Sequence, residues 1–171
     1  MRFLLLILTL ALITSCTMNS VGESFSDSRN ESVAKKRIQN ANPGLADAKI
    51  SVTSFDGIVL ITGQVSSADL IPIASAQVES LRNVRKVHNE LTVAGKTTLL
   101  SRTNDSWLTT KVKSTLSASE SSDATRIKVV TENGVVYLMG LLTRAEADAA
   151  VETTRGIKGV QKIVKVFEYI N

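Results

Sequence analysis

The sequence predicts an α+β fold of two small domains in tandem, each ordered α-β-β-α-β, with a three-stranded mixed sheet and two helices on one face. The first observation behind this prediction is an internal repeat. Residues 50–63 align without a gap with residues 127–140, and their glycines, turn residues and apolar positions agree together. The second is that a β-rich hairpin pattern in each copy is flanked by helical patterns. Two copies are too few for a solenoid, so we interpret them as two domains.

Each copy contains a predicted β-hairpin. Asp56-Gly57 and Asn133-Gly134 lie between β-rich runs, and such pairs favour a type I′ turn, which needs positive φ at both central residues. The strand after each turn is apolar throughout, which predicts a central strand packed on both faces. These strands are expected at residues 58–62 and 135–139, and the closing strands at 84–93 and 160–170.

A helix is predicted after each hairpin. In the second copy, Thr143 and Glu146 have the spacing of a capping box, and small or apolar residues then recur at helical intervals. In the first copy, Pro72 lies within the same stripe, so that helix should begin late enough to hold Pro72 in its first turn.

Another helix is predicted before each hairpin. The first, over residues 30–40, has a weak apolar stripe, and the second, over residues 106–117, has a firm one. Asn104 or Asp105 is available as the N-cap of the second helix.

The N-terminus has the layout of a secretory signal. Arg2 is followed by an apolar run at residues 3–13, and small residues come before Cys16. The run is shorter than the roughly 20 residues of a spanning helix. Its end resembles a lipobox, which implies that the chain is cut before Cys16 and that this residue is diacylated on sulfur and acylated on its new amine. Thr17 stands where many bacterial lipoproteins carry an inner-membrane retention aspartate, so the resemblance implies the periplasmic side of the outer membrane. The alternative is an unlipidated signal peptide with a chance cysteine.

The predicted organisation follows from these segments. It comprises a lipoprotein signal peptide at 1–15, a flexible tether at 16–29, a first domain at 30–93, a linker at 94–103 and a second domain at 104–171. Domains of about 65 residues are marginally stable alone, so we expect the two copies to pack on each other.

Composition argues against several classes of function. The formal net charge is +4, from 20 basic and 16 acidic residues spread evenly, which tolerates an anionic lipid surface but predicts no nucleic-acid partner. Cys16 is the only cysteine, so no intramolecular disulfide can form. His88 is the only histidine and is expected at an exposed or edge position of a strand. Without convergent titratable residues or a phosphate-binding motif, the sequence predicts neither an enzyme nor a metal or other cofactor.

The element order, the hairpin with its closing glycine, and the sequence Gly-Val-Gln-Lys-Ile-Val near the C-terminus resemble the BON domain. Two such domains behind a lipobox resemble the dual-BON-domain outer-membrane lipoproteins of Gram-negative bacteria. The resemblance covers about residues 30–170 and is densest in the second copy; the first departs from it at Asn83, which stands where the second has Gly159. It implies binding of anionic phospholipids such as phosphatidylglycerol through the first helix of the second domain, and a role in envelope integrity.

The residues of that helix can be placed on a wheel of about 100° per residue. Leu108 belongs to the core stripe, whereas Trp107 lies off it among small polar residues and a lysine. An indole suits the boundary between lipid headgroups and acyl chains, and an ammonium can contact lipid phosphate. The predicted lipid-contact set is Trp107, Leu108, Thr110, Lys111 and Ser114, with Leu108 at its border.

Two alternatives stay open from the sequence. Trp107 could fold over the neighbouring domain or the linker and fill the interface instead of meeting lipid. The protein could also be a lipid-anchored adaptor whose sheet face or edge strand binds an envelope-assembly partner. A peptidoglycan-contacting stress protein is a weaker third interpretation.

Overall fold

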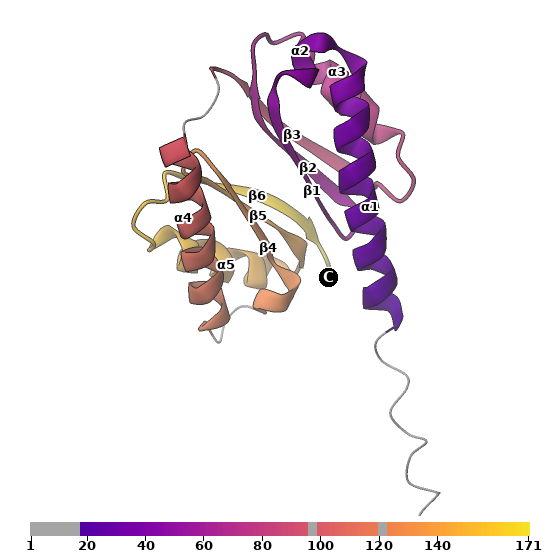
Figure 1. Ribbon diagram of the computed structural model, residues 1–171. Coiled ribbons are helices and arrows are strands. Elements are labelled where there is room, and N and C mark those ends of the chain that lie inside the picture. The colour runs from indigo at the N-terminus through magenta and orange to yellow at the C-terminus, as the bar shows by residue number, and fades with distance from the viewer. Residues whose placement is uncertain (1–17, 96–98, 120–122) are drawn as a thin grey trace, which may run out of the picture.

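The computed structural model describes residues 18–95, 99–119 and 123–171, which form two units of the same topology (Figure 1). The first contains α1 (Met18–Ala41), α2 (Pro43–Ala46), β1 (Lys49–Phe55), β2 (Ile58–Val65), α3 (Leu70–Glu79) and β3 (Lys86–Val93). The second contains α4 (Leu99–Ser117), the 3₁₀ turn η1 (Ala124–Arg126), β4 (Lys128–Glu132), β5 (Val135–Leu142), α5 (Arg144–Arg155) and β6 (Lys162–Tyr169).

The two sheets have the predicted mixed topology. Their orders are β1-β2-β3 and β4-β5-β6, and each central strand is antiparallel to the strand before it and parallel to the closing strand. The turn residues Asp56, Gly57, Asn133 and Gly134 all have positive φ, between 49° and 74°. The predicted hairpins and their type of turn are therefore confirmed.

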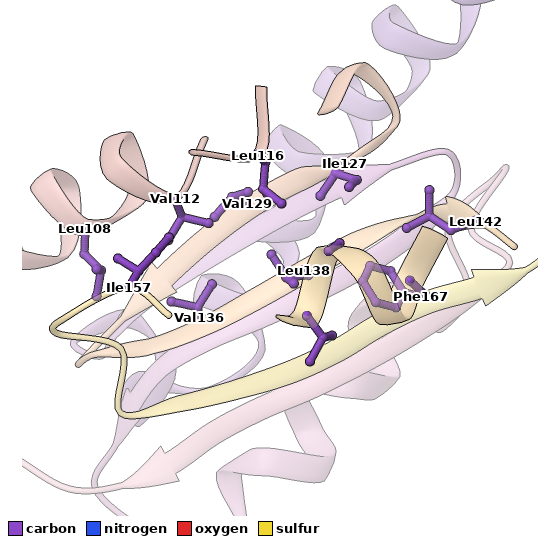
Figure 2. Close-up of a cluster of buried hydrophobic side chains, with 13 residues drawn as sticks. Leu108, Val112, Leu116, Ile127, Val129, Val136, Leu138, Leu142, Ile157 and Phe167 are labelled. Atoms are coloured by element: carbon purple, nitrogen blue, oxygen red, sulfur yellow. The ribbon is translucent and has the colours of Figure 1, made fainter. Parts of the chain in front are cut away.

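Each domain has its own core between the sheet and its helices. In Figure 1, α1 and α3 cover the outer face of the first sheet, and α4 and α5 cover the outer face of the second. Figure 2 shows the second core, where Leu108, Val112 and Leu116 of α4 point toward Val136 and Leu138 of β5. The first core is built in the same way, from α1, α3 and the outer face of β2.

A third apolar cluster joins the inner faces of the two sheets, and we call it the interdomain seam. Its buried members are Ile58 and Leu60 of β2, Tyr137 and Met139 of β5, and Val166 of β6. The seam buries the second face of each central strand; accordingly, all eight residues of β2 are buried. This arrangement confirms that the copies pack on each other, as their small size predicts.

Gly63 is a backbone requirement of the first sheet. Its φ is +132°, and a Cβ at this position would lie 2.1 Å from the carbonyl oxygen of Lys49 on β1. Strand β2 therefore passes β1 closely only because this residue has no side chain.

Parts of the predicted tether and linker are helical. Helix α1 begins at Met18, so residues 18–29 are helical where a flexible tether was expected. Helix α4 begins at Leu99, so residues 99–103, which were assigned to the linker, belong to a helix. Two short elements, α2 and η1, were not predicted, and the closing strands begin two residues later than expected.

The predicted N-cap was wrong, because Asp105 lies inside α4 and has another role. Its two carboxylate oxygens accept hydrogen bonds from the backbone N–H groups of Asn133 and Gly134, at 2.8 and 2.9 Å. Asp27 of α1 accepts the equivalent bonds from Asp56 and Gly57, at 2.8 and 3.2 Å. In both domains, one aspartate thus fastens the first helix to the turn of the hairpin.

Candidate functional site

The outward side of α4 carries two large exposed apolar side chains. Leu100 is 81% exposed and Trp107 is 55% exposed. Seven residues are nearly two helical turns, so the two side chains point in the same direction, about 10 Å apart along the axis. We call the surface formed by Leu100, Trp107, Thr110, Lys111 and Ser114 the Trp107 face.

Lys111 lies one turn after the indole and stacks on it. Its Nζ is 4.9 Å from the centroid of the Trp107 ring, within the range of a cation–π contact. The pair places a positive charge beside an exposed apolar ring. It also restricts the rotamers of both side chains before any ligand arrives.

The hydroxyl groups of the Trp107 face are satisfied within the helix. Thr110 Oγ1 donates to the carbonyl of Ser106 at 3.1 Å, and Ser114 Oγ donates to the carbonyl of Lys111 at 2.9 Å. Because both hydroxyl groups already donate to carbonyls of the helix, moving them from water into an apolar layer costs little free energy.

The exposed charges of α4 all have one sign. The only carboxylate of the helix, Asp105, is buried and bound to the hairpin turn, whereas Arg102 and Lys113 are exposed and Lys111 is half-exposed. The helix therefore presents only positive charge to an anionic surface, because it has no exposed carboxylate that would repel the surface.

Leu108 does not belong to the Trp107 face. It is 0% exposed and lies in the core of the second domain, so the prediction that it borders the lipid-contact set was wrong. Trp107, in contrast, is not a member of the interdomain seam. The indole therefore does not fill the interdomain seam.

Leu100 is the member of this face that sequence reasoning missed. The sequence predicts this helix only over residues 106–117, which leaves Leu100 in the predicted linker. The available signal was the seven-residue spacing between Leu100 and Trp107, which continues the outward side of the helix toward its N-terminus.

The first domain does not reproduce this face. Counted from the aspartates that bind the hairpin turns, Arg29 takes the position of Trp107, and Val33 takes that of Lys111. In the first domain, a guanidinium thus takes the place of the aromatic ring, and an apolar side chain takes the place of the ammonium. Among the described residues, the exposed aromatic–cation pair of a first helix therefore belongs to the second domain.

Cys16 and His88 are the other two residues that the sequence analysis singled out. Cys16, the predicted lipidation site, lies outside the described residues. His88 lies half-buried in the edge strand β3, and burial, followed by the charge of Lys86, lowers its pKa below 6.5. Residues 18–95, 99–119 and 123–171 include no group of three or more His, Cys, Asp or Glu side chains that could hold a metal ion. No helix within these same ranges has the length and apolarity that crossing a membrane requires.

Comparison with known proteins decides the family. The family model of the BON domain matches residues 26–95 and 104–171. The chain belongs to the BON domain family. The first BON match starts four residues before the predicted boundary at 30, in the segment of α1 that contains Asp27, and the second starts where the sequence predicted.

Two relatives match most of the chain at more than one third identity. The chain is 40% identical over 126 residues to outer membrane lipoprotein DolP of Haemophilus influenzae, a match that covers 74% of this chain and 65% of the relative. It is 38% identical over 124 residues to the 21 kDa hemolysin of Actinobacillus pleuropneumoniae, covering 72% and 64%. The matched region thus spans just under two thirds of each relative.

A more distant relative is the osmotically-inducible protein Y of Escherichia coli, 25% identical over 150 residues, with 86% of this chain and 74% of the relative covered. Together with the two BON domains, the similarity to DolP places the chain among outer-membrane lipoproteins.

Proposed function

We propose that this BON-domain lipoprotein is anchored on the periplasmic side of the outer membrane, binds anionic phospholipid through the Trp107 face of α4, and thereby supports envelope integrity. The observation that carries the proposal is the exposed indole of Trp107 with the Lys111 ammonium stacked on its ring. Leu100 extends the apolar contact along the same side of the helix.

The chemistry of the face suits a headgroup layer. The indole has an apolar body and one N–H donor, so it is stable where acyl chains give way to headgroups. Lys111 can bury its methylene stem there while its ammonium contacts lipid phosphate, a contribution of about 1 kcal/mol for a basic residue near an anionic surface. Neutral lipid lacks this second attraction, so the face should discriminate by headgroup charge.

The affinity of this face alone is expected to be low. One tryptophan, one leucine and one or two lysines supply only a few kcal/mol. An acylated Cys16 would hold the domain at the same membrane and raise the local lipid concentration, so a weak site would still be occupied. The similarity to DolP, which is named an outer membrane lipoprotein, supports this anchored arrangement.

Liposome flotation tests the proposal. The chain from residue 17 onward contains every described residue and lacks the predicted acyl anchor. It should float with vesicles of phosphatidylglycerol and phosphatidylethanolamine, but not with phosphatidylcholine alone. Trp107→Glu should lower the bound fraction at least about tenfold, because it puts a carboxylate where the indole enters the lipid layer.

Matched controls separate the site from general effects of charge. Lys111→Glu should weaken binding strongly, whereas Lys36→Glu, an equal change of charge on the exposed side of α1, should alter it little. Tyr169→Glu removes another exposed aromatic residue and should leave flotation intact. Binding that ignores headgroup charge, or that survives Trp107→Glu, would overturn the proposal. In that case, recovery of a crosslinked envelope protein would favour the adaptor function.

A further inference from the structure

A second surface of the second domain has the properties of a binding groove. It lies between the C-terminal half of α5 and the start of β6, and its volume is about 300 Å³. Three apolar side chains, Val151, Val160 and Ile163, line it together with three basic ones, Arg155, Lys162 and Lys165.

The groove runs beside an unpaired strand edge. Strand β6 is an edge strand of the β4-β5-β6 sheet, so no other strand of the described residues pairs with its backbone on the side away from β5. The first four residues of β6 are exposed or half-buried, whereas Val166 and Phe167 further along are buried. The start of β6, which adjoins the groove, is therefore accessible, as are Glu168 and Tyr169 at the other end of the strand.

The charge of the groove selects for acidic groups. None of its lining residues carries a carboxylate. Lys165 and Arg155 pair with Asp148 and Glu152, but those carboxylates belong to exposed residues of α5 that do not line the groove. Lys162 makes no ion pair within the described ranges. The ammonium and guanidinium groups thus surround an apolar floor without an internal counter-ion.

The equivalent place of the first domain has a different contact between edge strand and helix. There Asn89 of β3 donates from its amide to the carbonyl of Ile71 and to Ser75 Oγ, at 2.9 and 2.8 Å, and so ties the edge strand to α3. In the second domain the ion pair of Lys165 with Asp148, which is exposed, stands in its place. The contact between the edge strand and its helix is thus neutral in the first domain and charged in the second.

We propose that the β6 edge and this groove bind an extended, acidic polypeptide segment of a partner protein, which adds to the sheet as a fourth strand. Its backbone pairs with β6. Its carboxylates lie on the face toward α5, near Arg155 and Lys165, and its alternate apolar side chains lie on the opposite face, beside Val164. This site is separate from the Trp107 face and does not depend on lipid binding.

The test uses a fluorescein-labelled decapeptide of alternating glutamate and valine, and the chain from residue 17 onward. Fluorescence anisotropy should show saturable binding, and the backbone amides that shift in NMR spectra should fall at the start of β6. Methylation of every second peptide nitrogen along one edge should weaken binding at least about tenfold, because it blocks pairing with the strand.

Protein variants supply a matched comparison. Arg155→Gln with Lys165→Gln should weaken binding at least about tenfold, whereas Lys35→Gln with Lys36→Gln, which removes the same charge from α1, should change it less than about twofold. Circular dichroism melts check that both variants fold. The proposal is overturned if nothing binds at about 1 mM peptide, if a lysine–valine peptide binds equally well, or if the shifted amides lie elsewhere. Equal binding of the methylated peptide would also overturn it, since the contact would then be electrostatic without strand pairing.

Discussion

In each domain, one aspartate carboxylate fastens the first helix to a hairpin turn that lies far away in the sequence. Asp105 accepts two backbone N–H groups from the turn between β4 and β5, and the residue is only 6% exposed. Asparagine offers one acceptor oxygen instead of two and no charge, so Asp105→Asn should leave one buried N–H unsatisfied. We expect the free energy of unfolding to fall by about 1–3 kcal/mol, measured by urea denaturation.

Asp69→Asn is the control for this prediction. Asp69 precedes α3, is exposed and makes no side-chain capping hydrogen bond, so the same chemical change should alter stability by less than about 0.5 kcal/mol. Equal effects of the two substitutions would show that the contact between Asp105 and the turn contributes nothing specific.

At the scale of one element, α5 is held by its capping box, as the sequence predicted. Both the backbone N–H and the hydroxyl of Thr143 donate to Glu146 at 2.8 Å, and Arg126 pairs with the same carboxylate. The hydrogen bonds from Thr143, with the charge of Arg126 as a smaller cause, hold the pKa of Glu146 below its usual 4.5.

A pH dependence follows from this lowered pKa. A carboxyl group whose pKa is lower in the folded state stabilises the fold above its unfolded pKa, and this contribution is lost as pH falls through the folded pKa. The difference in stability between the native chain and Glu146→Gln should thus be present near neutral pH and shrink as pH falls below 4.5, measured by denaturation at each pH. Glu152→Gln, which removes a carboxylate from an exposed surface ion pair, is the matched control and should change stability at neutral pH by less than about 0.5 kcal/mol.

The elements also show how far the sequence could be interpreted. The hairpin turns, the capping box and Pro72 in the first turn of α3 follow local rules, and the structure confirms them. The start of α4 could not be predicted from local rules. Asp105 resembles an N-cap locally, but its actual partners are the distant N–H groups of Asn133 and Gly134. The helical wheel correctly predicted that Trp107 is exposed. Leu100 was not predicted as a site residue, because the predicted helix starts after it.

At the scale of the whole molecule, the interdomain seam makes one body of two marginal domains. Polar contacts border its apolar centre: Gln64 donates to Glu132 at 3.0 Å, and Arg85 pairs with Glu168 at 3.1 Å. The sequence could predict that the copies pack, but not through which faces, because residues on both sides of each central strand are apolar. The seam leaves the Trp107 face and the β6 groove free for separate contacts.

The seam predicts that damage in one domain weakens the other. Leu60 is buried in the seam and does not belong to the core between the first sheet and its helices. Leu60→Asp puts a charge against Tyr137 and Met139, so hydrogen exchange of the β5 amides in the second domain should become at least about tenfold faster. Leu100→Asp, an equal change at an exposed position, should leave this exchange unchanged. If exchange in β5 keeps its native rate in Leu60→Asp while the first domain loosens, the two domains fold independently and the seam is only a contact between them.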